Sequence, residues 1–157
     1  MKIIAPLFKN VIFQMIEKNV SFLLIGGYAV NYYGYGRYTG DIDFWLKPDN
    51  ENKLKLINVF TELGRAREEF CEVEKLDFGI AQTISIGEGP MRIDFFTEVN
   101  LVNFDDAWEK RVEWPLENYK VPVVNYQDLI LTKFNTGRTK DKHDLEELQK
   151  INQKSQE

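Results

Sequence analysis

The 157-residue chain has a single cysteine, Cys71, and a single histidine, His143. One cysteine excludes an internal disulfide, and we interpret Cys71 as a small, mostly buried apolar side chain in a reducing compartment. A histidine without histidine or cysteine partners gives little support for a zinc site or for a histidine-activated nucleophile. We therefore expect His143 to face the solvent.

Long hydrophobic runs and an excess of basic residues are also missing. No apolar run approaches the roughly 20 residues needed to span a bilayer, and the N-terminal residues lack the features of a signal peptide. With 20 lysines and arginines against 25 aspartates and glutamates, the net charge is −5, which gives the whole chain no electrostatic preference for nucleic acid. These absences predict a soluble cytoplasmic protein that does not enter a membrane.

The sequence does have the composition of a globular domain. Hydrophobic residues make up 43% and aromatic residues 13%, which is enough to bury a core at this length. No repeat or low-complexity linker divides the chain. We therefore predict one domain over residues 1–157, with a core over about 20–124 and two C-terminal helices over about 126–152.

Hydrophobic periodicity and turn residues give the expected elements. Helices are expected at the start, in the middle and at the end of the chain, with strands between them. This order predicts a mixed sheet flanked by helices, an α/β or α+β domain. Pro122 is interpreted as the mark of an edge strand. The helices are expected over residues 6–19, 28–33, 50–63, 104–112, 126–136 and 140–151, and the strands over 21–26, 41–46, 69–75, 79–86, 91–96 and 121–124.

Three aspartates stand out in two of these strands. Asp41 and Asp43 are two residues apart, so they face one way while the apolar residues beside them face the other. Asp94 has apolar neighbours of the same kind in a later strand. One interpretation is that all three aspartates simply lie on the solvent-exposed face of a half-exposed sheet. Aspartate is unfavourable in strands and like charges on one face repel, so we favour a site for Mg²⁺ and a nucleoside triphosphate.

A glycine pair follows the buried run at residues 22–25 and begins a helix. Gly26 and Gly27 would expose backbone N–H groups at the positive end of that helix, where a phosphate can approach closely. Glycine pairs more often make ordinary turns. The phosphate interpretation therefore depends on Asp41 and Asp43, which follow shortly after.

Two cations are further candidates for contact with the nucleotide. Arg37 pairs either with a phosphate or with one of the aspartates that follow it. Lys133 lies beside the apolar stripe of its helix, so it either extends to solvent or reaches a buried anion, which near a triphosphate is a phosphate.

Asp141 and Asp144 share one face of the last helix. Their default interpretation is structural, as anchors for Arg138 or Lys140.

These residues together predict transfer of a nucleoside monophosphate from a nucleoside triphosphate to a hydroxyl group, with release of pyrophosphate. Three acceptors remain open: a small drug or metabolite, the end of a tRNA, and a protein hydroxyl. The acidic balance and compact size suit a small molecule. A tRNA would require a local basic track, for which the candidates are Lys133, Arg138, Lys140 and Lys142.

The same residues resemble the nucleotidyltransferase superfamily, which has the fold of DNA polymerase β and of the minimal nucleotidyltransferases. The family pattern is a glycine pair, an acidic-x-acidic strand and a later acidic strand residue. The spacing, and the C-terminal Lys140-Asp141 followed by Asp144, are most similar to small bacterial members. These include the lincosamide-type antibiotic nucleotidyltransferases and the AbiEii-like toxin or antitoxin enzymes. The matching residues are Gly26, Gly27, Asp41, Asp43 and Asp94.

The resemblance implies a nucleotidyltransferase fold that uses an NTP, ATP included, with two Mg²⁺ ions, or Mn²⁺ in their place. Asp41 and Asp43 would bind the metal, and Asp94 would complete the site or take the acceptor's proton. Because no large helical domain is added, a small region, a second copy or a partner protein would recognise the acceptor.

A different function is a non-catalytic partner-binding module of a toxin–antitoxin type system. The three aspartates argue against that function, because a docking module does not require mutually repelling carboxylates.

Overall fold

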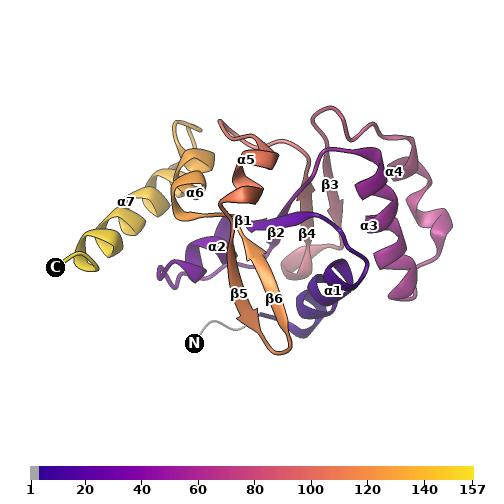
Figure 1. Cartoon of the computed structure of the whole chain (residues 1–157), viewed down its shortest axis with the longest axis horizontal. Helices are drawn as coiled ribbons and strands as arrows, with labels where there is room; N and C mark the ends of the chain where they lie inside the picture. Colours follow the sequence, from indigo (N-terminus) through magenta and orange to yellow (C-terminus); the bar gives the residue numbers. More distant parts are fainter. Residues whose placement is uncertain (1–3) are drawn as a thin grey trace.

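A computed structural model describes residues 4–157, which form a six-stranded mixed sheet with flanking helices (Figure 1). The strand order is β3-β4-β2-β1-β6-β5. The strands are β1 Phe22–Ile25, β2 Ile42–Leu46, β3 Thr83–Ile86, β4 Ile93–Phe96, β5 Val112–Leu116 and β6 Tyr119–Val123. The helices are α1 Pro6–Glu17, α2 Gly26–Tyr32, α3 Asn50–Glu62, α4 Cys71–Lys75, α5 Phe104–Glu109, α6 Tyr126–Lys133 and α7 Thr139–Lys154, with 3-10 turns at Arg67–Phe70 and Gly89–Met91.

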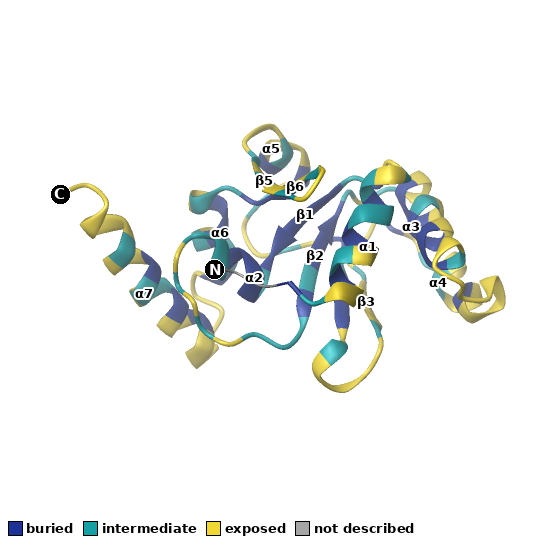
Figure 2. Cartoon of the chain, turned by 90° about the horizontal axis from the view of Figure 1, so that it is seen from below, coloured by how far each residue is buried: buried dark blue, intermediate teal, exposed yellow. Residues whose placement is uncertain are grey.

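The predicted fold class, a mixed sheet with helices around it and a C-terminal helical pair, is confirmed. Helices α2, α6 and α7 lie toward one end of the sheet, and α3 and α4 lie at the other end (Figure 1). Buried residues are concentrated in the central strands β1 and β2 (Figure 2). None of the helices in the described part of the chain is long and apolar enough to cross a membrane.

Side-chain alternation in β2 and β4 separates the core from the opposite face of the sheet. Phe44 and Phe95 stack with ring centroids 5.6 Å apart, and Phe60 of α3 packs edge-on against Phe95. The intervening Asp43 and Asp94 therefore project from the other face. Burial of the aromatic rings on one face fixes the direction of both carboxylates, because a slip of one residue would exchange the two faces.

The strand register brings distant parts of the sequence together at one end of the sheet. Strand β2 is antiparallel to β1, with Asp43 opposite Ile25. On its other side β2 is parallel to β4, with Asp43 opposite Asp94. The residue that follows β1, Gly26, is thus beside the same carboxylate.

The predicted strand over residues 69–75 is wrong, because this segment is a 3-10 turn followed by α4. Its glutamates are spaced for helical pairs, such as Lys75 with Glu72 at 2.9 Å, and the Lys53 amine donates to two carbonyl groups at its end. The interpretation of Cys71 as a buried residue is also wrong, since the first residue of this short surface helix is exposed.

Pro122 does not mark an edge strand. Strand β6 lies between β1 and β5, and β5 is the edge strand that the sequence did not predict. The two strands form a hairpin in which Leu116 is opposite Tyr119. The turn between them has Glu117 at φ +55° and contains no glycine, so it lacks the usual sequence signal of a tight hairpin.

Candidate active site

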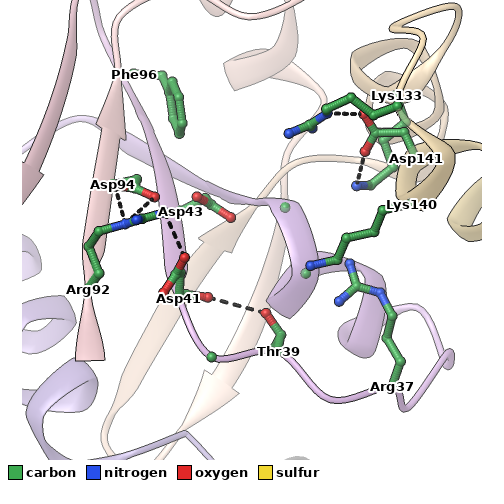
Figure 3. A pocket seen from close by; sticks show the side chains of 14 residues that line it. Arg37, Thr39, Asp41, Asp43, Arg92, Asp94, Phe96, Lys133, Lys140 and Asp141 are labelled. Atoms are coloured by element: carbon green, nitrogen blue, oxygen red, sulfur yellow. Dashed lines mark hydrogen bonds and ion pairs between the residues drawn. The ribbon is translucent and has the colours of Figure 1, made fainter. Parts of the chain in front are cut away.

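One cavity of about 600 Å³ is lined by every residue that the sequence suggested for the site. The acidic side comes from β2, β4 and the residue before β2, and the basic side comes from α6, α7 and the loop before β2 (Figure 3). The predicted residues that the cavity brings together are Gly26, Gly27, Arg37, Asp41, Asp43, Asp94 and Lys133.

Two of the three carboxylates have protein partners. Asp94 is buried and accepts a hydrogen bond from the Ser85 hydroxyl on β3 at 2.6 Å. The Arg92 guanidinium donates to Asp41 Oδ2 from Nη2 at 2.8 Å and to Asp94 Oδ2 from Nε at 3.2 Å (Figure 3). Arg92 thus neutralises part of the acidic side from within the pocket.

Asp43 differs from the other two carboxylates. It has no hydrogen bond or ion pair with any of residues 4–157. Burial is the main cause that raises the pKa of Asp43 to about 6, and the negative charges of Asp94 and Asp41 add to this, while Lys133 partly opposes it. Asp43 is partly buried, and a carboxylate without a partner in such a place is costly to keep charged, so the position is suited to a bound cation.

The glycine pair allows close contact with the acidic strand. Gly26 has φ +65°, a conformation that other residues rarely adopt, and a Cβ atom there would overlap the Asp43 carboxylate. A Cβ atom on Gly27 would overlap the Thr39 hydroxyl. Helix α2 starts at Gly26 itself and has only seven residues, so the contribution of the glycines is space beside Asp43 rather than a long helix dipole.

Alanine in place of Gly26 is expected to lower the free energy of unfolding by about 1–3 kcal/mol, because of the positive φ and the overlap with Asp43. Urea denaturation measures this change. Gly36→Ala is the matched control, since a Cβ atom there meets no atom within 4 Å, and its effect is expected to stay within about 1 kcal/mol. Equal stability of the two variants would show that the left-handed turn is not required.

Arg37 and Lys133 meet at one buried carboxylate on α7. Arg37 forms a two-pronged pair with Asp144, from Nε at 2.6 Å and from Nη2 at 2.9 Å. The Lys133 amine lies 3.0 Å from Asp144 and 3.1 Å from Asp141. Arg37 thus pairs with an aspartate, but with one 107 residues away rather than with the nearby Asp41. The part of either cation in nucleotide binding stays a prediction.

The structural role expected of Asp141, as an anchor for Arg138, is confirmed, whereas Asp144 pairs with Arg37 and Lys133 in place of Arg138 or Lys140. Asp141 accepts hydrogen bonds from Arg138 and from the Thr136 hydroxyl, both at 2.7 Å. Burial alone would raise the pKa of both carboxyls, but the hydrogen bonds and charges from Arg37, Lys133 and the other donors outweigh burial and lower each pKa below its usual value.

His143 is exposed as expected, and its Nε2 lies 3.0 Å from the Tyr35 hydroxyl. It is not among the residues that line the cavity.

Sequence reasoning missed Arg92, Ser85 and Phe96. Arg92 precedes Asp94 by two residues, so strand alternation alone puts both on one face, and this signal was present in the sequence. Phe96 follows Asp94 by two residues and carried the same signal, whereas Ser85 carried none, because its place depends on the pairing of β3 with β4.

The sheet, the glycine turn and the carboxylates define a nucleotidyltransferase fold. The chain matches over residues 7–157 the model of a family described as "nucleotidyl transferase of unknown function" (DUF2204), and it belongs to this family. The predicted resemblance to the nucleotidyltransferase superfamily is thereby confirmed.

Among solved structures, the chain is similar to that of the lincosamide antibiotic adenylyltransferase LnuA with lincomycin bound. The TM-score is 0.56 at 15% identity, and the match covers 96% of this chain and 99% of the other. At this identity the likeness shows the fold alone. No curated protein matches the sequence.

Proposed function

We propose that this protein transfers a nucleoside monophosphate from a nucleoside triphosphate to the hydroxyl group of a small molecule, in a reaction that depends on a divalent metal. An acceptor oxygen would form a bond to the α-phosphorus, the bond from that phosphorus to the β-phosphate oxygen would break, and pyrophosphate would leave. The observation that carries this proposal is Asp43, a carboxylate without a partner that lies beside Asp41 and Asp94 in one cavity.

The acidic residues fit a divalent cation. Oxygen ligands are those that Mg²⁺ prefers, and it is usually held by one or two carboxylates together with substrate phosphates. Within residues 4–157 no group of three or more acidic, histidine or cysteine side chains is already arranged around a metal position. Asp41 and Asp43 would hold the metal, with Asp94 as a third ligand. When bound, the metal supplies charge neutralisation for in-line displacement.

Side chains of the chain itself would position the reactants. Asp94 is fixed by the Ser85 hydroxyl and would accept the proton of the acceptor hydroxyl. Gly26 and Gly27 leave room for phosphate beside Asp43. Arg37 and Lys133 would contribute positive charge on the opposite side of the cavity.

Lys140 also lines the cavity, and it has no hydrogen bond or ion pair with the part of the chain that the structure describes. It points into the pocket in Figure 3. We therefore add Lys140 as the cation best placed to contact a phosphate.

The distribution of charge supports a small acceptor over a tRNA end. Arg37, Lys133 and Arg138 are each paired with a buried carboxylate of α7, and Lys142 does not line the cavity. Of the four residues considered for a basic track, Lys140 alone lines the cavity without an ion pair among residues 4–157, which is little positive charge for an RNA backbone. The likeness to a lincosamide adenylyltransferase favours ATP as donor and a drug-sized hydroxyl compound as acceptor.

Thermal unfolding with Mg²⁺ and each of the four NTPs tests the nucleotide site. We expect at least one metal–nucleotide pair to raise the Tm by about 5 °C or more when present at about 100 times its Kd. The same nucleotide without Mg²⁺ is the control. Labelled ATP, Mg²⁺ and a set of hydroxyl-bearing drugs and metabolites then identify the acceptor. No Tm change with any pair would contradict transfer and would favour a partner-binding module.

A further inference from the structure

The Arg92 side chain lies where two of the proposed metal ligands meet. Its Nη2 is 2.8 Å from Asp41 Oδ2, and its Nε is 3.2 Å from Asp94 Oδ2 (Figure 3). One guanidinium therefore joins a carboxylate that precedes β2 to a carboxylate of β4.

The backbone holds Arg92 in this place. Its carbonyl accepts a hydrogen bond from the Ile42 N–H at 3.2 Å, which ties the start of β4 to the start of β2. Because Arg92 and Asp94 are two residues apart, their side chains leave the backbone on the same face of the sheet. The guanidinium therefore lies next to both carboxylates, and no rearrangement of the fold is needed to bring it there.

The two contacts of Arg92 differ in exposure, since the Asp94 side chain is only 10% exposed while the contact with Asp41 lies at the surface. The Arg92 side chain is 46% exposed and that of Asp41 is 37% exposed. Ion pairs at this level of exposure contribute little to stability, and an arginine side chain has several rotatable bonds with which to move into solvent. The ion pair with Asp41 therefore adds little to the stability of the fold, which sets it apart from the buried pairs of Asp144.

We infer that Arg92 is an internal cation of the metal-free pocket, which occupies Asp41 and Asp94 until a divalent metal displaces it. This inference rests on the proposed function. Asp43 carries no such partner, so it is the carboxylate at which a metal can first be held. Full coordination by Asp41 and Asp94 then requires the guanidinium to leave.

This competition lowers the affinity of the metal-free pocket for a metal that arrives without a nucleotide. A metal alone gains only the carboxylates and must displace Arg92, whereas a metal with a triphosphate also gains phosphate oxygens as ligands. Displacement of Arg92 lowers metal affinity in both cases, so the wild-type chain depends on the phosphate oxygens to hold a metal tightly, and loss of Arg92 raises metal affinity with and without nucleotide.

The test is to measure Mn²⁺ binding to the wild-type chain and to Arg92→Gln. The electron paramagnetic resonance signal of the free ion reports how much Mn²⁺ remains unbound. Each protein is titrated alone and with α,β-methylene-ATP, whose α–β bond does not break in the transfer reaction. We expect Arg92→Gln to bind Mn²⁺ about tenfold more tightly than the wild type in the absence of nucleotide, and also more tightly than the wild type when nucleotide is present.

Two further variants separate competition from general charge. Arg138→Gln removes the same charge from the same cavity, but its partner is Asp141 at 2.7 Å, so its effect on Mn²⁺ affinity without nucleotide is expected to stay within about threefold. Arg92→Lys keeps the charge and loses the two-pronged contact, and its Mn²⁺ affinity is expected between those of the wild type and Arg92→Gln. Arg92→Lys also serves as the test if Arg92→Gln does not fold.

The outcomes distinguish this inference from the proposed function. Unchanged or weaker Mn²⁺ binding by Arg92→Gln, with normal binding of Mn²⁺ and nucleotide by the wild type, would overturn the role of Arg92 alone. An equal gain in Arg138→Gln would overturn it as well. If none of these proteins binds Mn²⁺, with or without nucleotide, both the role of Arg92 and the proposed function would be overturned.

Discussion

Asp43→Asn is expected to lower the rate of nucleotidyl transfer by roughly a thousandfold, because it removes the carboxylate proposed to hold the metal. The same change is expected to raise the free energy of unfolding at pH 7 by about 2 kcal/mol, since the pKa of Asp43 is raised to about 6. Transfer assays and urea denaturation measure the two effects. Loss of activity together with a gain in stability is the signature of a carboxylate kept for function.

The pH dependence of this gain has a definite sign. In the unfolded chain the carboxyl has a pKa near 4, so between about pH 4 and pH 6 the folded state binds more protons and its stability falls as the pH rises. The destabilisation by Asp43 is therefore absent below about pH 4 and complete above about pH 6. Asp106→Asn, at an exposed position of α5, is the control and should change neither stability nor transfer. A folded Asp43→Asn with wild-type activity would exclude Asp43 from the reaction.

The largest loss of stability is expected for Asp144→Ala, at about 3–5 kcal/mol. The Asp144 side chain is fully buried and pairs with both Arg37 and Lys133. Its removal leaves the 6%-exposed Lys133 side chain with one acidic partner fewer and leaves the Arg37 guanidinium without its two-pronged contact. The loop before β2, α6 and α7 lose their common connection at the same time.

Glu147→Ala is the matched control for Asp144→Ala. It lies one turn further along α7, and its ion pair with Lys150 is on the surface, so we expect a change within about 1 kcal/mol. Denaturation of both variants at pH 7 makes the comparison. Similar losses in the two would show that the buried contacts of Asp144 do not stabilise the fold.

The sequence predicted features that are set by neighbours in the chain. The alternation around Asp41, Asp43 and Asp94 follows from the two-residue period of a strand, and the turn at Gly26 follows from the freedom of glycine. These local rules suggested a set of residues that the structure brings into one cavity. Their roles in binding and catalysis remain predictions.

Features that depend on contacts between distant segments were not predicted. The partner of Arg37 is Asp144, which reaches it only because α7 packs beside the loop before β2. Strand β5 was missed because its hairpin turn uses Glu117 in a left-handed conformation in place of glycine. Helix α4 was assigned to a strand because a short glutamate-rich segment has no clear period of its own.

The two sides of the cavity are made at different times during translation. Strands β2 and β4 leave the ribosome before α6 and α7, and Arg92 emerges with Asp94, so the acidic side and its counter-ion are synthesised together. Lys133 and Asp144 come later, and until then Arg37 lacks its partner. A nascent chain therefore completes the cationic side only when α7 has emerged, so the carboxylates of β2 and β4 precede the cations that face them across the cavity.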